Sequence, residues 1–323
     1  MTTADLLGKL EQVVIALAAF AAVIGLLLFI IDRAPKKRKD FFQLIGFVTP
    51  AFLLLIIGLV YPAIRTAIQS LYDAKGNFIG LDNFVWAFTQ PDSLVSLRNT
   101  VIWVILTPIA STAIGLAYAV FIDKSRGEKY FKALVFMPMA ISFVGASIIW
   151  KFVYEYRPTS ANQIGILNQL VVWLGGEPVQ WLQSVPANTV FLVIVMVWIQ
   201  TGFAMVVLSA AIKGVPTEIV EAAQLDGTNA FQRFLHVTLP GIQGSLVVVV
   251  TTISIATLKV FDIVRTMTAG NFDTSVLANE MYTQAFRAGE PGRGSALALI
   301  LFVLVLPIVI YNVRVLRKQR EIR

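Results

Sequence analysis

The chain has no cysteine, one histidine and few charged residues, and each shortage excludes a class of function. Without cysteine among its 323 residues it can form no disulfide, thiolate metal site or cysteine nucleophile. Charged residues make up only 14% of the chain, against about 25% in an ordinary soluble domain. The single histidine, His236, lies in a polar connecting segment, where we expect a surface residue rather than a ligand or a catalyst. Composition therefore argues against a soluble enzyme.

Motifs for nucleotide binding, hydrolysis and metal binding are missing as well. No Gly-x-x-x-x-Gly-Lys-[Ser/Thr] phosphate loop occurs, so the chain is not expected to bind ATP by that route. There is no Gly-x-Ser-x-Gly elbow, no His-x-x-x-His pair and no carboxylate cluster with metal-ligand spacing. We therefore expect no catalytic residue, no metal site and no cofactor in this chain. An ATP-driven activity would need a separate ATPase.

Long apolar segments are what the chain has instead, since 57% of its residues are hydrophobic. Seven segments approach the length of about 20 residues that spans a bilayer as a helix. In lipid, backbone groups must pair within the segment, and runs of this length do so as helices. The sequence therefore predicts an all-α, polytopic membrane bundle of about seven transmembrane helices. The segments are 12–31, 42–64, 99–122, 133–154, 188–212, 242–264 and 295–313.

Basic residues gather on one side of these segments. The stretches 32–41, 123–132 and 213–241 and the tail from Arg314 together hold 16 Lys and Arg. The positive-inside rule places these loops in the cytoplasm, with the N-terminus outside and the C-terminus inside. We therefore interpret the basic clusters as topology signals in a multi-pass protein of the cell (inner) membrane, in contact with lipid and not with nucleic acid.

The first apolar segment is followed, not preceded, by its basic cluster, which favours a retained helix over a signal peptide. Residues 1–40 are thus predicted to form an extra helix and a basic loop. Residues 41–323 are predicted to form the main transmembrane domain.

The most informative loop is 213–240, on the predicted cytoplasmic side. Pro216 and Thr217 resemble a helix start, with Thr217 as the cap of an amphipathic helix over 218–225. Gly227 is predicted to end this helix, because glycine adopts positive φ readily. Thr228 or Asn229 is expected to cap a second helix that runs to Leu235, and Pro240 to end the unit. The result is a helix–Gly–helix knob that can dock into a groove of another protein.

The spacing in this loop resembles the signature of permeases in binding-protein-dependent ATP-binding-cassette importers. That signature is Glu-Ala-Ala, three residues, Gly, nine residues, an aliphatic residue, one residue and Leu-Pro. Val237 stands where Ile is usual. The resemblance implies that the loop docks into the ATPase subunit. It assigns the coupling role to Glu221, Ala222, Ala223, Asp226, Gly227, Leu239 and Pro240.

Further segments along the chain resemble the carbohydrate branch of these permeases, the maltose-type larger subunit. Two stretches, 137–147 and 198–209, are similar to α-glucoside permeases, which points to maltose, trehalose or a related sugar. The run Ala269-Gly270-Asn271-Phe272 departs from the Gly-Gly-Pro turn of many sugar permeases. The segments of wider resemblance are 80–84, 98–100, 136–138, 165–168, 260–262 and 294–296.

The resemblance implies a permease subunit that moves a small sugar by alternating access. Its expected partners are a second, homologous permease, an ATPase dimer that carries ATP and Mg²⁺, and an extracytoplasmic solute-binding protein. Two alternatives remain open from the residues alone. One is an ion-coupled secondary sugar carrier, which inverted repeats and a buried acidic site would favour. The other is a membrane-bound enzyme or assembly scaffold.

A sugar needs hydrogen-bond partners and an aromatic face, and three residues in the predicted spans offer them. Trp198 and Gln200 lie in the fifth segment, and Thr257 lies in the sixth. The alternative for each is helix packing through small and polar side chains, which is common in membranes. Lys259 and Asp262, three residues apart, are predicted to form an ion pair near the outer mouth.

Overall fold

The structure is a computed structural model that describes residues 3–32, 39–123 and 125–321. It divides into two compact units, unit 1 (Met1–Thr66) and unit 2 (Ala67–Arg323). All regular structure in the described residues is helical, apart from an isolated bridge between Tyr72 and Phe78. The prediction of an all-helical membrane protein is therefore confirmed.

Unit 1 consists of two long helical segments that pack against each other. Apolar side chains such as Phe20 and Leu54 are exposed along both of them. A helix that exposes apolar residues along its length suits lipid rather than water. The elements are α1 (Thr3–Asp32), α2 (Lys39–Leu55), the π-helix η2 (Ile56–Val60) and the beginning of α3 (Tyr61–Gln69).

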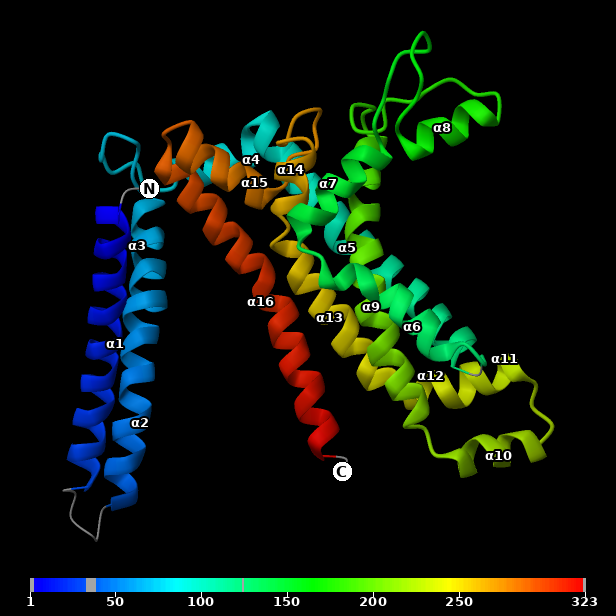
Figure 1. Cartoon of the computed structure of the whole chain (residues 1–323), viewed down its shortest axis with the longest axis horizontal. Helices are drawn as coiled ribbons and strands as arrows, with labels where there is room; N and C mark the ends of the chain where they lie inside the picture. The colour runs from blue at the N-terminus through cyan, green and yellow to red at the C-terminus, as the bar shows by residue number, and fades with distance from the viewer. Residues whose placement is uncertain (1–2, 33–38, 124, 322–323) are drawn as a thin grey trace. The chain divides into compact units, whose positions relative to one another are not determined.

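Unit 2 contains the remaining elements (Figure 1). In chain order they are α4 (Asp82–Thr89), α5 (Pro91–Ile122), α6 (Glu128–Phe136), the 3₁₀-helix η3 (Met137–Ala140), α7 (Phe143–Val153), α8 (Ile166–Trp173), α9 (Ala187–Lys213), α10 (Thr217–Leu225), α11 (Ala230–Arg233), the π-helix η4 (Phe234–Thr238), α12 (Leu239–Gly241), α13 (Gln243–Leu258), α14 (Asp262–Met267), α15 (Leu277–Tyr282), the π-helix η5 (Thr283–Arg287) and α16 (Pro291–Glu321).

Helix α9 is the centre of unit 2. It contacts α5, α6, α7, α13 and α14, and both of the larger buried apolar clusters are built around it. Of its most apolar 18 residues 56% are buried, against 17% in α16. A change that shifts α9 will therefore also displace or strain the helices packed against it in unit 2.

Helices α5 and α9 run side by side in the same direction. Near their starts, Asn99 and Asn188 both donate hydrogen bonds to the loop 272–275. At their far ends, the Ser209 hydroxyl donates to Asp123 just beyond α5. We call these two ends of unit 2 the Asn99 end and the Lys213 end.

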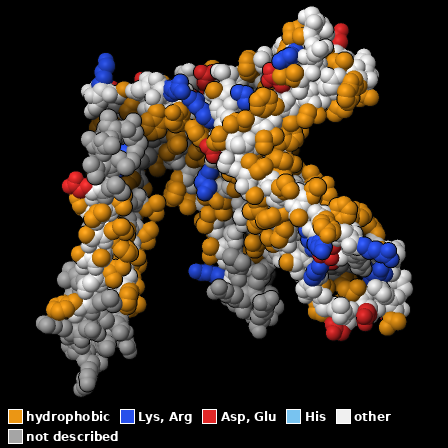
Figure 2. Space-filling model, in the orientation of Figure 1, with side chains coloured by type: hydrophobic (Ala, Val, Ile, Leu, Met, Phe, Trp, Pro, Cys, Tyr) orange, Lys and Arg blue, Asp and Glu red, His pale blue; other side chains and the backbone are white. Residues whose placement is uncertain are grey.

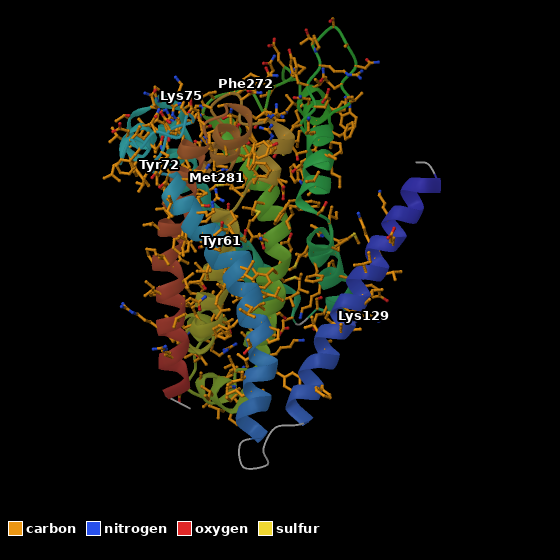
Figure 3. All side chains as sticks on the ribbon, turned by 90° about the vertical axis from the view of Figure 1, so that its left-hand side faces the viewer. Tyr61, Tyr72, Lys75, Lys129, Phe272 and Met281 are labelled. Carbon is orange, nitrogen blue, oxygen red and sulfur yellow. The ribbon has the colours of Figure 1, made fainter. Side chains whose placement is uncertain are left out.

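The two ends of unit 2 are built from different elements. Figure 3 places Tyr72, Lys75 and Phe272 at the Asn99 end. Figure 1 shows that α10, α11 and α12 lie at the other, the Lys213 end. The loop that resembles an ATPase-docking segment is therefore separated from the loops at the Asn99 end by the length of α9.

Among the described residues, four to six spans qualify by length and composition, against a prediction of about seven. The first predicted segment, 12–31, lies in α1, where only the shorter stretch Glu11–Gly25 qualifies as an apolar helix. Four helices qualify outright, and two bent pairs raise the number to six if each pair crosses once. The four are Leu44–Gln69, Pro91–Ile122, Ala187–Lys213 and Pro291–Val315.

One bent pair lies where a continuous span was predicted, and the other joins the predicted loop 213–240 to the next predicted span. The segment 133–154 is broken by 104° between Ala140 and Phe143, where η3 carries Pro138 and the Ser142 hydroxyl accepts from the Gly145 N–H to begin α7. A proline and a new N-cap stop one helix and start another. The start of the segment 242–264 is bent by 69° at Ile242. Hydropathy predicts the length of an apolar run but not its bends.

The predicted ion pair between Lys259 and Asp262 is wrong. Helix α13 ends at Leu258, and Phe261 has extended φ before α14 begins at Asp262. The two residues are therefore not one turn apart on a single helix. No ion pair joins them among the described residues.

Candidate functional site

The segment between α9 and α13 begins with helix α10, which ends in a Schellman motif. Gly227 has φ of 79°, and its N–H donates to the Gln224 carbonyl over 3.0 Å. The next N–H, of Thr228, donates to the Ala223 carbonyl over 3.2 Å. Positive φ suits glycine, which lacks the Cβ that would crowd the backbone. The prediction that Gly227 ends this helix is confirmed.

The start of α10 differs from the prediction. Pro216 occupies the cap position without a side-chain bond, and Thr217 is the first helical residue. The Thr217 cap is therefore wrong by one position. The second helix is capped as predicted by Asn229, whose side chain accepts from the Gln232 N–H while the Gln232 side chain accepts from the Asn229 N–H, both over 2.9 Å.

The second helix continues past its predicted end at Leu235. Helical backbone runs through α11, η4 and α12 to Gly241, so Pro240 does not end it. Proline lacks the N–H for the bond to the residue four earlier. The chain accommodates this with the π-turn η4, in which the Leu239 N–H donates to the Phe234 carbonyl five residues back.

The segment 217–241 is an exposed knob at the Lys213 end, and we name it the α10–α12 knob. The two ends of the knob meet at its base, where a Cβ on Gly241 would lie 3.2 Å from the Val215 side chain. Leu225 is 90% exposed and Phe231 is 69% exposed. Figure 2 shows acidic side chains gathered on this part of the molecule. Exposed apolar anchors between carboxylates suit a protein partner that offers an apolar groove with basic residues.

The predicted coupling residues fall into two groups on the knob. The first group is exposed or half-buried on α10 and its C-terminal turn. Its acids make no ion pair with any described residue, so they are available to a partner. The second group is Leu239 and Pro240, which lie at the base of the knob in α12. The first group is Glu221, Ala222, Ala223, Asp226 and Gly227.

The predicted sugar residues on α9 lie in two different surroundings. Trp198 is half-buried and meets Trp150 of α7 edge-to-face, with ring centroids 5.8 Å apart. Gln200 is 9% exposed, yet its amide makes no hydrogen bond with any described residue. Its amide atoms are not among the fully enclosed polar atoms that lack a partner, so they remain accessible. Such a group is a candidate for binding a polar ligand.

Helix α5 presents further unpaired polar groups at the level of Gln200 and one turn before it. Ser111 and Thr107 are fully buried, and their hydroxyls have no hydrogen-bond partner among the described residues. Ser111 lies one turn before Gly115, just as Gln200 lies one turn before Ala204, which Gly115 touches. Since the helices are parallel, Ser111 and Gln200 occupy the same level. Sequence reasoning missed Thr107 and Ser111; their four-residue spacing in an apolar span was the available signal.

Thr257, the third predicted sugar residue, is fully buried in α13. Its hydroxyl donates to the Ile253 carbonyl over 2.7 Å, so its single donor is used within its own helix. No described hydrogen bond joins Thr257 to Trp198 or Gln200. The Thr257 hydroxyl can still accept a hydrogen bond, so its part in sugar binding stays a prediction.

The loop at the Asn99 end has an unusual backbone held by buried amides. Phe272 and Asp273, which are not glycines, both have φ of 57°. Asn99 of α5 donates to the Asp273 carbonyl over 2.6 Å, and Asn188 of α9 donates to the Phe272 carbonyl over 2.6 Å. Left-handed backbone at such residues costs of order 1–3 kcal/mol and persists where the surroundings enforce it. This pinned loop was not predicted.

A family model matches most of the transmembrane part of the chain. The family model described as "Binding-protein-dependent transport system inner membrane component" matches residues 111–321. This range begins within α5 and includes the α10–α12 knob. It covers well over half of the chain.

Three curated proteins are similar over most of the chain. The osmoprotective compounds uptake permease protein GgtC of Synechocystis sp. is 48% identical over 86% of this chain and all of its own length. The α-glucoside transport system permease protein AglF of Rhizobium meliloti is 47% identical over 83% of this chain and 80% of its own. Trehalose/maltose permease MalF of Thermococcus litoralis is 28% identical over 85% of this chain and 93% of its own.

The fold is similar to that of a solved bacterial transporter for import of the acidic polysaccharide alginate. A chain of that transporter superposes with a TM-score of 0.75 at 22% identity, over 88% of this chain and 98% of its own. In a second structure the same kind of transporter was solved in complex with a periplasmic protein bound to an alginate pentasaccharide. At 22% identity this similarity supports a shared fold and nothing about function.

Proposed function

Because the chain belongs to the family of binding-protein-dependent transport system inner membrane components, we propose that it is the permease subunit of an ATP-driven importer of small sugars. The observation that carries the proposal is the α10–α12 knob. It combines exposed acids, Leu225 that is 90% exposed and a Gly227 turn at one end of a helical membrane bundle. The family assignment gives no support to the ion-coupled carrier.

The knob is the docking segment for a separate ATPase in this proposal. Glu221 and Asp226 offer carboxylates without partners, and charge-assisted hydrogen bonds to arginine are among the stronger polar contacts. ATP and Mg²⁺ then belong to an ATPase dimer. Hydrolysis takes place there, and this chain converts the closure of the dimer into helix movement.

The substrate we propose is an α-glucoside such as maltose or trehalose. The 47% identity to an α-glucoside permease supports this class. The 48% identity to an osmoprotective compounds permease supports a compatible solute. Trehalose satisfies both descriptions, so it is the first sugar to test. Gln200, with Ser111 at its level and Thr107 one turn away, is our candidate for hydrogen bonds to sugar hydroxyls, and Trp198 is our candidate for stacking.

The topology we propose follows the positive-inside rule. The Lys213 end faces the cytoplasm, the N-terminus lies outside, and each bent pair counts as one span. With α1 this gives seven spans. Residues 1–40 then form an accessory helix and loop, and residues 41–323 form the permease domain.

Transport proceeds by alternating access in this proposal. A loaded solute-binding protein docks on the loops of the Asn99 end. Closure of the ATPase dimer moves the α10–α12 knob, and this chain and a homologous permease then accept the sugar between them. Hydrolysis returns the inward-facing state. The loop 272–275, held by hydrogen bonds at the Asn99 end, suits docking of the binding protein. The exposed knob at the other end suits docking of the ATPase.

The test is reconstitution in liposomes of this chain with its ATPase, partner permease and binding protein. ATP hydrolysis and sugar uptake are measured with binding protein loaded with trehalose, maltose or glycine betaine. Stimulation by trehalose or maltose supports the proposal. Stimulation by betaine alone keeps the importer and removes the sugar. Uptake that persists without ATP, with no ATPase bound, removes the importer and favours a secondary carrier.

A further inference from the structure

Four charged side chains meet at the Lys213 end, where α5 ends, α6 begins and α9 ends. The Lys213 ammonium lies 2.5 Å from Glu128 Oε1 and 3.3 Å from Asp123 Oδ1. The Lys132 ammonium approaches the same two oxygens, at 2.6 Å and 3.6 Å. Ser209 adds a hydroxyl, which donates to Asp123 over 3.2 Å and accepts from Lys132. Two cations and two anions therefore balance within one network.

The network differs from an ordinary surface ion pair. The Asp123 side chain is only 15% exposed, and it contacts both ammonium groups. Isolated exposed pairs contribute little because water screens them and side-chain entropy opposes them. A shared, partly buried network retains more of its attraction and fixes geometry. The pair Glu128–Lys132 is internal to α6, so Lys213 supplies the charge that ties α9 to the other two helices.

The position of Lys213 gives the network its significance. Lys213 is the last residue of α9, and only Gly214, Val215 and Pro216 separate it from α10. A force applied to α10 therefore reaches Lys213 through a connector of only three residues. The short connector includes a glycine, so without a tie it can bend and absorb the displacement.

The two helices that the network joins to Lys213 extend from it towards the level of Ser111 and Gln200. Asp123 follows α5, whose buried face carries Ser111 and Gly115. Helix α6 contacts α9 again at Gly202, where an added Cβ would lie 2.7 Å from the Val135 carbonyl. In lipid, no hydrophobic effect holds helices together, so polar links and close packing determine which of them move as a body.

We propose that Asp123, Glu128, Lys132 and Lys213 form a clasp that transmits displacement of the α10–α12 knob to α5 and α6. They are positioning residues, since none of them is placed at the sugar level. The inference rests on the proposed function, because it assumes that an ATPase moves the knob. With the clasp closed, the ends of α5, α6 and α9 move together. With it open, the knob moves while the bundle stays, and ATP is hydrolysed without import.

The experiment measures sugar imported per ATP hydrolysed in the reconstituted complex. Lys213→Met keeps the length of the side chain and removes its charge, and Asp123→Asn removes the shared anion. The double exchange Asp123→Lys with Lys213→Asp keeps two charges of each sign. Lys129→Met is the matched control, because Lys129 lies on α6 but contacts only the Tyr130 ring among the described residues.

We expect the ratio of sugar to ATP to fall at least about fivefold in Lys213→Met and Asp123→Asn, the lower range of allosteric coupling. Loaded binding protein should still stimulate ATP hydrolysis in both variants. The double exchange should recover much of the ratio, and Lys129→Met should match the wild type. Recovery by exchanged charges distinguishes a clasp from a side chain that merely packs.

A wild-type ratio in both single variants would overturn the clasp and leave the importer intact. Loss of complex assembly in Lys213→Met that the double exchange does not repair would also overturn it, because the network would then hold the fold rather than transmit motion. A wild-type complex that binds no ATPase, or whose hydrolysis ignores loaded binding protein, would instead remove the proposed function. The two failures are therefore distinguishable.

Discussion

Gly115 of α5 lies directly against Ala204 of α9, so closely that a Cβ on Gly115 would stand 2.6 Å from the Ala204 Cβ. The same Cβ would lie 2.8 Å from the Met205 backbone nitrogen, which cannot rotate away. Small residues allow helix backbones to approach in membranes. This contact sets the spacing of α5 and α9, and with it the spacing between Ser111 and Gln200.

Replacement of Gly115 by alanine should therefore force the two helices apart. Overpacking of this kind costs about 1–3 kcal/mol. Gly58→Ala is the matched control, since no described atom of unit 1 outside its own helix backbone lies within 4 Å of its added Cβ, and alanine favours helix there. Thermal unfolding of the purified protein in detergent should show a lower midpoint for Gly115→Ala only. Equal midpoints would contradict the close contact.

Gln200→Leu should lower sugar uptake while the protein becomes no less stable. The amide has no hydrogen-bond partner to lose among the described residues, and its atoms are not among the fully enclosed ones, so leucine should change stability little. Uptake at limiting sugar should fall roughly tenfold if one or two hydrogen bonds to the substrate are lost. Both uptake and the unfolding midpoint are measured.

The control for Gln200 is Thr201→Val. The Thr201 hydroxyl is bonded to the Val197 carbonyl of its own helix over 2.7 Å, so its loss should leave uptake nearly unchanged. A lower midpoint in Gln200→Leu together with normal uptake would assign the amide to packing. The sugar would then have to be bound elsewhere.

The regular helices could be predicted from the sequence because, in lipid, an apolar run of this length can pair its backbone groups only as a helix. The predicted segments 99–122 and 188–212 lie within α5 and α9, which begin at Pro91 and Ala187. The bend between α6 and α7 was missed because the apolar run continues through it. A proline such as Pro138 often produces only a modest kink within a span. Packing against the other helices determines that the chain turns by 104° here.

The candidate site was predictable where chemistry is local and not where it is assembled by packing. Gly227 ends a helix through its own backbone freedom, and Asn229 caps the next one through neighbouring atoms, so sequence reasoning found both. The pairing of Ser111 with the level of Gln200 depends on the register of two helices far apart in the chain. The same holds for Lys213 with Asp123.

Gly227→Ala should weaken association with the ATPase. Its φ of 79° is left-handed, and an L-residue pays about 1–2 kcal/mol there, which loosens the turn that orients α10. Gly76→Ala is a matched control, because Gly76 has φ of 84° with no atom within 4 Å of an added Cβ, in a loop at the Asn99 end. Copurification of the ATPase should fall for Gly227→Ala alone. An equal effect of both, or of neither, would contradict docking through this knob.

Asn99→Leu should impair the response to the binding protein without weakening association with the ATPase. Its amide donates to the Asp273 and Ser275 carbonyls over 2.6 and 2.9 Å, and these bonds hold a loop whose left-handed residues would otherwise relax. Leucine leaves the two carbonyls unpaired and the loop free to change shape. The expected result is normal copurification of the ATPase with a reduced stimulation of hydrolysis by loaded binding protein. Asn83→Leu is the control, since Asn83 likewise donates to two backbone carbonyls at this end. If both variants respond alike, general loosening accounts for the loss, and the pinned loop has no special part in docking.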